Sequence, residues 1–208
     1  MAYDLEEQEQ LDELKAWWKL HGNKVLSAAT AALVIFAGVQ GWAAYQHKQS
    51  LEASVQYEAL IQLDAKNAKA IHAAAAKLVD KYAGTPYAAR AALFAARADY
   101  AANDVKNAKL QIEWVLNHAS EDALRTIARL QMAGLQFEEK QYDEALKSLG
   151  EKHDVGYEGL FADLKGDTLV AQGKVSEAKA AYAEALLHLD SEGRYHRFTE
   201  RKLDALGS

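Results

Sequence analysis

The stretch GKVSEAKAAYAEA, residues 173–185, carries the pattern that decides the fold of this 208-residue chain. It opens with Gly173-Lys174, continues with one apolar and two polar residues before Ala178, and places the large apolar Tyr182 four residues after that alanine. Residues four apart lie on the same face of an α-helix. The stretch therefore predicts a turn followed by a helix with a small and then a large residue on one face.

The same pattern occurs twice upstream, in KQYDEALKSL (residues 140–149) and NDVKNAKLQI (residues 103–112). Superposing the three stretches aligns Ala108, Ala145 and Ala178, at spacings of 37 and 33 residues. Alanine suits a position where two helices cross too closely for a larger side chain. A period of about 34 residues built from helix–turn–helix units resembles tetratricopeptide repeats.

The three units match the tetratricopeptide repeat pattern only in part. Gly166 falls at that family's small-residue position in the first helix of a pair, but the first-helix tryptophan and the closing proline are absent from all three units. Residues 47–82 could form a fourth, weaker unit. The alternative is an ordinary helical bundle in which the alanine spacing is accidental.

Only helices are expected from His47 onward, because the chain has a single proline and is rich in alanine. Thr85 followed by Pro86 predicts one helix start, with an N-cap and a proline at the first helical position. The expected helices are 47–63, 66–82, 85–102, 104–118, 120–139, 141–149, 157–172, 174–189 and 193–206. In the first of them, an apolar residue recurs every fourth position and predicts the apolar face of a stalk helix: Leu51, Val55, Ala59 and Leu63.

A charge-free stretch of 21 residues, from Val25 to Tyr45, precedes the repeats. As a helix it would rise roughly 31 Å, which matches the hydrocarbon core of a bilayer. A cleaved signal peptide would begin with a basic region and have a shorter apolar core, and a buried helix of a soluble domain would alternate with polar residues. Aromatic residues flank the stretch as membrane-interface anchors would (Trp17, Trp18, Trp42 and Tyr45). We therefore expect a transmembrane helix.

The distribution of lysines predicts the orientation of this helix. Lys15, Lys19 and Lys24 precede it, and Lys48 follows it closely. Since positive charges stay in the cytoplasm, the N-terminus is expected there. The predicted organisation is a cytoplasmic acidic tail (1–24), a transmembrane helix (25–45) and a repeat domain on the far side (46–208).

The composition argues against several kinds of chemistry. A net charge of −6 without a basic block argues against nucleic acid as a partner. Zero cysteines exclude disulfides, thiolate metal sites and a cysteine nucleophile. The histidines show no zinc-ligand spacing, and no glycine-rich phosphate loop or catalytic motif is present. We expect no enzyme activity, no cofactor and no metal.

A binding groove is the more productive hypothesis. In a superhelix of helix pairs, the first helix of each pair lines the concave face. The repeat register assigns to this face Arg90, Leu93, Arg97, Tyr100, Leu130, Phe137, Asp163, Asp167 and Val170. Such a groove would have a basic end, an apolar middle and an acidic end, which suits an extended peptide or a partner's helix. The alternative is that Arg97 and Asp163 form salt bridges within the chain.

The layout of the whole chain resembles the YfgM family, the ancillary subunits of the bacterial SecYEG translocon. The shared features are an acidic N-terminal tail, two tryptophans and a lysine before one span, Gly41-Trp42 near its exit and degenerate repeats. The segment GYEGLFADLKGD (156–167) and the ending KLDAL (202–206) are also similar to that family.

The YfgM resemblance implies a protein of the inner membrane of Gram-negative bacteria, with its repeat domain in the periplasm. It further implies association with the SecYEG translocon and with a PpiD-like membrane-anchored chaperone, where secreted polypeptides are received. A contact between the acidic tail and a cytoplasmic stress-response regulator would also follow. The competing hypothesis is a membrane-anchored scaffold for another envelope complex, in division or outer-membrane assembly, which shares the same anchor and repeats.

Overall fold

The computed structural model describes the backbone of residues 2–207 and the side chains of residues 10–207. Within this range the chain forms nine α-helices and one 3-10 helix and contains no strand, which confirms the all-α prediction. The chain divides into two units, Met1–Lys48 and Gln49–Ser208. Most of the acidic side chains of the predicted tail (Asp4, Glu6, Glu7 and Glu9) lie outside the described residues.

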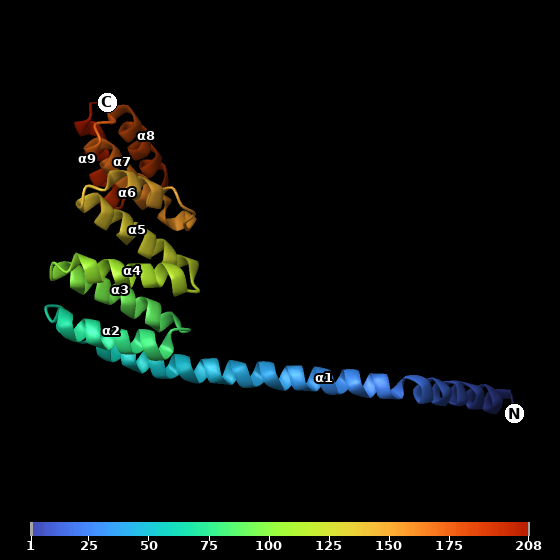
Figure 1. The fold of residues 1–208 in the computed structure, drawn as a ribbon. Helices are drawn as coiled ribbons and strands as arrows, with labels where there is room; N and C mark the ends of the chain where they lie inside the picture. Colours follow the sequence, from blue (N-terminus) through green and yellow to red (C-terminus); the bar gives the residue numbers. More distant parts are fainter. Residues whose placement is uncertain (1, 208) are drawn as a thin grey trace. The chain divides into compact units, whose positions relative to one another are not determined.

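Helix α1 runs without interruption from Ala2 to Ile61, so the predicted span and the stalk belong to one helix (Figure 1). Every residue from Val25 to Tyr45 is exposed. Among the described residues, α1 is the one helix that is long and apolar enough to cross a membrane. A helix that is apolar on all sides and unburied by protein needs an apolar solvent, which a bilayer supplies.

The end of α1 packs through a different face from the predicted one. Leu51 and Val55 are 56% and 65% exposed, whereas Ala53 and Leu60 are buried at 0% and 1%, with Tyr57 between them partly buried. Helices α2 and α3 cover this second face. Residues spaced by four drift by about 40° per step around a helix, whereas spacings of three and four together follow one face. The predicted apolar face was therefore wrong for Leu51 and Val55, whereas Leu63, just beyond the helix, packs against this core.

The second unit is a succession of helices, each beside the next in chain order (Figure 1). Their bounds are α2 Ala68–Tyr82, α3 Pro86–Ala101, α4 Val105–His118, α5 Asp122–Glu138, α6 Tyr142–Leu149, η1 Val155–Tyr157, α7 Glu158–Ala171, α8 Val175–His188 and α9 Arg194–Ala205. Thr85 is the N-cap of α3 and Pro86 its first residue, as predicted. The predicted boundaries agree with the structure to within two residues.

The turns within the three helix pairs repeat the same backbone geometry. Asn103, Lys140 and Gly173 each adopt a positive φ, of 63°, 62° and 75°. The N–H of the residue after each of them donates to a carbonyl five residues earlier: Asp104 to Asp99, Gln141 to Gln136, and Lys174 to Leu169, at 2.8, 2.8 and 2.9 Å. This is a Schellman closure of the first helix. The three turns keep the spacing of the aligned alanines, which confirms the repeat register.

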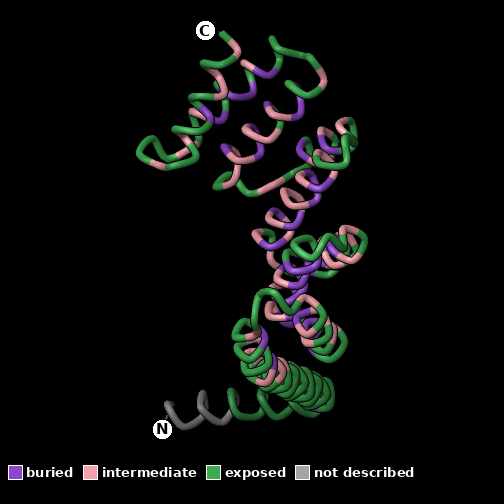
Figure 2. Tube along the Cα trace, turned by 90° about the vertical axis from the view of Figure 1, so that its left-hand side faces the viewer, coloured by how far each residue is buried: buried purple, intermediate pink, exposed green. Residues whose placement is uncertain are grey.

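The aligned alanines lie at the crossings of the helix pairs. Ala108, Ala145 and Ala178 are all 0% exposed. The large residues four positions later are also buried: Ile112, Leu149 and Tyr182, at 2%, 5% and 3%. Figure 2 shows buried residues recurring along the helices of the second unit. The expected alternation of a small crossing residue and a large filling residue is confirmed.

Gly166 of α7 shows how close such a crossing is. A Cβ atom added there would lie 2.4 Å from Cε1 of Tyr182 on α8. No side chain fits in that space unless the tyrosine ring moves. The small-residue position that the sequence predicted is therefore a packing requirement.

Candidate binding groove

The nine predicted groove residues lie on α3, α5 and α7, the first helices of three successive pairs. These helices pack in the order α3, α5, α7. The structure nevertheless divides the nine residues into three groups, because some are used in internal packing, some are covered by α9 and some face an open hollow.

The N-terminal members of the set, Arg90 and Leu93, are used internally. The Arg90 guanidinium donates two hydrogen bonds to the Glu121 carboxylate, at 3.2 and 3.0 Å, and so joins α3 to the start of α5. Leu93 is 7% exposed and belongs to the core formed by α3, α4 and α5. The prediction of an open surface was therefore wrong for Leu93, which is buried, whereas Arg90 is partly exposed but paired within the chain.

The acidic end of the predicted groove is covered by α9. Lys202 Nζ lies 2.8 Å from both the Asp163 and the Asp167 carboxylates. The Thr199 hydroxyl donates to Asp163 at 2.8 Å, and the Tyr182 hydroxyl donates to Asp167 at 2.7 Å. The alternative of internal pairing therefore holds for Asp163, and the prediction of an open acidic end was wrong.

The contacts under α9 change the pKa values of Lys202 and Tyr182. Burial lowers the pKa of Lys202, but its hydrogen bonds to Asp163 and Asp167 outweigh that effect, so that its pKa is raised above the ordinary value. Burial, followed by the hydrogen bond to Asp167, raises the pKa of Tyr182. Both groups stay protonated in the folded cluster, so that the Lys202 cation and the Tyr182 hydroxyl bond to the aspartates of α7 and hold α7, α8 and α9 together.

The apolar members of the set lie beside neighbouring side chains. Leu130 packs on the small core around Leu149 and Phe161. The Phe137 ring lies 5.9 Å from the Tyr142 ring, between centroids. Val170, at the matching position of α7, is 38% exposed. These residues support the repeat stack more than they form a continuous apolar channel.

Arg97 and Tyr100 remain open. Tyr100 is 45% exposed, and Arg97 has neither an ion pair nor a hydrogen bond among residues 10–207. Both line a hollow of about 250 Å³ between α3, α4 and α5. The lining consists of Ala96, Arg97, Tyr100, Ile112, Gln131, Gly134, Leu135 and Glu138. It is mostly apolar, with one cation and one anion among its lining residues.

Four lining residues from α5 were missed by the sequence analysis: Gln131, Gly134, Leu135 and Glu138. Gly134 carried a usable signal. It is a lone glycine inside a helix and stands at the repeat position of Arg97 and Asp167. Glycine is unfavourable in a helix interior, so its presence there points to a steric or functional reason. In the repeat register Gly134 lies on the predicted concave face, which suggests that the reason concerns the groove.

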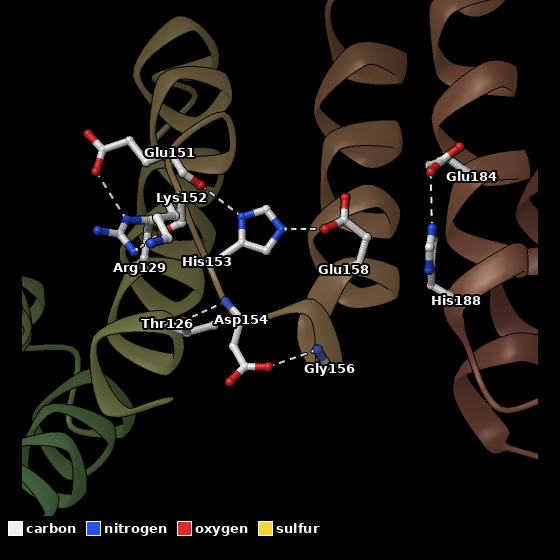
Figure 3. A network of polar contacts seen from close by, with 10 residues as sticks. All are labelled: Thr126, Arg129, Glu151, Lys152, His153, Asp154, Gly156, Glu158, Glu184 and His188. Carbon is white, nitrogen blue, oxygen red and sulfur yellow. Dashed lines mark hydrogen bonds and ion pairs between the residues drawn. The ribbon is translucent and has the colours of Figure 1, made fainter. Parts of the chain in front are cut away.

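A polar network at the α6–α7 connection is a further cluster of charged side chains (Figure 3). Arg129 bonds to the Glu151 carboxylate at 3.1 Å and to the Lys152 carbonyl at 2.7 Å. The His153 ring stacks on Phe161 at 3.8 Å, with its two nitrogens 2.8 Å from the Glu151 carbonyl and 3.0 Å from Glu158.

This network fixes the long connection between the second and third helix pairs. A second hollow, of about 480 Å³, lies beside it, but the arginines that line it are already bonded: Arg129 as above, and Arg125 to Asp122 and to the Ala119 carbonyl. Within the described part of the chain, no three His, Asp or Glu side chains gather closely enough to hold a metal ion. The hollow at Arg97 and Tyr100 is therefore the better candidate for a binding site, because Arg97 is unpaired within the described residues.

The fold and the groove define a repeat protein of helix pairs attached to a long apolar helix. A family model described as a tetratricopeptide repeat-like domain matches residues 15–208. No solved structure matches the chain.

Curated relatives narrow this class. The chain is 30% identical over 213 residues to the ancillary SecYEG translocon subunit of Neisseria gonorrhoeae, covering 99% of this chain and 100% of that protein. It is 29% identical to the protein of the same name from Haemophilus influenzae, over 89% of this chain and 91% of that one, and 25% identical to that of Escherichia coli K12, over 85% of each. The chain belongs to this family of ancillary SecYEG translocon subunits.

Proposed function

We propose that this protein is a non-catalytic, single-pass subunit of the bacterial inner membrane that works beside the Sec translocon. The observation that carries the proposal is the similarity, over nearly the full length, to relatives named for that translocon. The exposed apolar stretch Val25–Tyr45 supports a membrane span. The lysines before it support a cytoplasmic N-terminus, with residues 46–208 in the periplasm.

The proposed mechanism is local concentration of a binding surface. A span beside the channel keeps the repeat domain near every emerging polypeptide, so that weak contacts suffice for capture. The hollow at Arg97 and Tyr100 supplies such contacts, and a PpiD-like chaperone acts next on the same secreted chain. The acidic N-terminal tail, on the cytoplasmic side, is available to a stress-response regulator.

Site-specific crosslinking at the end of the span tests the translocon assignment. Trp42 is 63% exposed and lies at the exit of the predicted span. A photo-crosslinking residue at this position should capture a translocon subunit in living cells, whereas the same residue at Leu110 of α4, which is 52% exposed, should not. Capture of a division or outer-membrane assembly protein in place of a translocon subunit would favour the scaffold hypothesis and contradict the proposal.

Deletion of residues 1–46 separates the anchor from the repeats. The truncated protein should remain helical and lose its co-purification with the translocon, because the span provides the proximity. If co-purification persisted, the repeats alone would carry the contact, and the role assigned to the span would be wrong.

A further inference from the structure

Gly134 stands in a space that the protein leaves open. It is an interior residue of α5, and a Cβ atom added to it would meet nothing within 4 Å. Gly166, by contrast, is forced to be glycine by the Tyr182 ring. Since glycine weakens a helix interior relative to alanine, packing does not explain Gly134. A larger residue at position 134 would fill the open space beside it.

The size and lining of this space suit a single side chain. The hollow of about 250 Å³ is smaller than the usual sites for drug-sized ligands, which begin near 300 Å³. Ile112 and Leu135 contribute apolar surface, and Tyr100 is a half-exposed aromatic ring on its wall. An aromatic or large aliphatic side chain placed there would leave water and pack on that ring.

The charged residues that line the hollow determine which residues can flank the bound side chain. Arg97 is exposed and unpaired within residues 10–207, and Glu138 is likewise exposed with no ion pair in that range. A carboxylate beside Arg97 and a cation beside Glu138 would complement the two charges and set the direction of a bound segment.

In the other two repeat units the position of Gly134 carries a side chain. The position of Gly134 corresponds to Arg97 in the preceding unit and to Asp167 in the following one. Asp167 is bonded to Tyr182 and Lys202, so that position is filled and paired within the chain. Of the three matching positions, that of Gly134 has no side chain, and the unpaired Arg97 of the preceding unit lines the same hollow.

We propose that the hollow at Gly134 binds one large apolar side chain, aromatic above all, of an extended polypeptide that carries an acidic residue on the Arg97 side. This inference rests on the proposed function, because it names the kind of polypeptide segment that the repeat domain receives. It makes the protein selective for aromatic residues in acidic surroundings, among the many sequences that pass through a translocon.

Peptide binding to the full-length protein in lipid nanodiscs tests this assignment. The probe is a fluorescein-labelled peptide, Gly-Ser-Asp-Trp-Ser-Lys-Gly, with two matched peptides: one has alanine for tryptophan, and one has the aspartate and lysine exchanged. The tryptophan peptide should bind about tenfold more tightly than the alanine peptide, the difference typical of a buried aromatic contact. The exchanged peptide should bind more weakly than the probe.

Two variants and a control locate the contact. Gly134→Leu fills the hollow and should weaken binding of the probe about tenfold, to the level of the alanine peptide. Arg97→Glu should abolish the preference for the probe over the exchanged peptide. Ala183→Leu introduces the same side chain at an exposed position of α8 and should leave binding unchanged. Circular dichroism of each variant checks that helicity is retained.

Three results would overturn the assignment: no saturable binding of the probe by the wild-type protein, equal affinity for the tryptophan and alanine peptides, or unchanged binding by a folded Gly134→Leu protein. Failure of the proposed function is a separate outcome. If the crosslinker at Trp42 captured no translocon subunit while these peptide preferences held, the site would stand and the translocon assignment would fall.

Discussion

The middle and the C-terminal helix pairs use the same repeat positions in opposite ways. At the C-terminal pair, Asp163 and Asp167 are covered by α9 and bonded to Lys202. At the middle pair, the position that matches Asp167 is Gly134, which lines a hollow together with the unpaired Arg97 of the first pair. The repeat register decides which positions face the groove, and the next helix decides whether they are open. A position that is internally neutralised serves stability, and one that is left open is available to a partner.

The two glycines give the largest predicted contrast in stability. Gly166→Leu should lower the free energy of unfolding by about 3 kcal/mol, because the added side chain collides with a tyrosine ring held by Asp167. Gly134→Leu should cause no such loss, since its Cβ meets nothing within 4 Å. Chemical unfolding followed by circular dichroism measures both. Equal losses would show that the two positions are packed alike.

Removal of Lys202 tests the closed end of the comparison. Lys202→Met should cost roughly 1–3 kcal/mol, because two partly buried carboxylates lose their cation. Arg97→Met, at the open end, should change stability by less than about 0.5 kcal/mol, as expected for an exposed and unpaired residue. The same unfolding experiment compares them. A large loss for Arg97→Met would mean that the open end contributes to the fold.

Gly134→Ala tests whether the hollow at Gly134 is kept at a cost in stability. The substitution should raise the free energy of unfolding by about 0.5–1 kcal/mol, because alanine favours the helix and its methyl group has room. The control is Gly84→Ala, outside the helix interiors, for which no helix-interior gain is expected. If Gly134→Ala were destabilising, the space at Gly134 would be needed by the fold itself.

Alkaline pH should weaken the contact of α9 with α7 and α8, and this effect should be smaller than those of the substitutions above. The pKa values of Lys202 and Tyr182 are both raised in the folded protein, from ordinary values of 10.5 and 10.0. The stabilisation from these groups is therefore complete below about pH 10 and is lost as the pH rises through the folded pKa values. Melting temperatures measured from pH 8 upward should fall more steeply above pH 10 for the wild type than for Lys202→Met. Parallel curves would contradict the role given to Lys202.

The repeat and its helices could be predicted because they depend on local spacing. Ala108, Ala145 and Ala178 repeat a pattern that any helix pair of this kind requires, and their burial follows. The pairing of Asp163 with Lys202 joins residues 39 positions apart. No periodicity identifies which lysine will meet which aspartate, so the closed end was read as open.

The face of α1 that packs could not be predicted for a related reason. An apolar residue every fourth position is compatible with a membrane-facing or a protein-facing helix, and the choice depends on where α2 returns. Leu51 and Val55 therefore remained exposed, while the small Ala53 was buried. Gly134 could have been recognised, because a lone glycine within a helix at a concave repeat position is unusual on its own.

Photo-crosslinking in living cells from Tyr100 and Val170 tests the central claim most directly. The two residues hold the same repeat position and are similarly exposed, at 45% and 38%, but only Tyr100 lines the hollow. An aromatic photo-crosslinking residue at position 100 should capture secreted polypeptides in transit, and Gly134→Leu should abolish the capture, whereas position 170 should capture little. Equal capture from both positions, or capture at position 100 that persists in Gly134→Leu, would contradict the account.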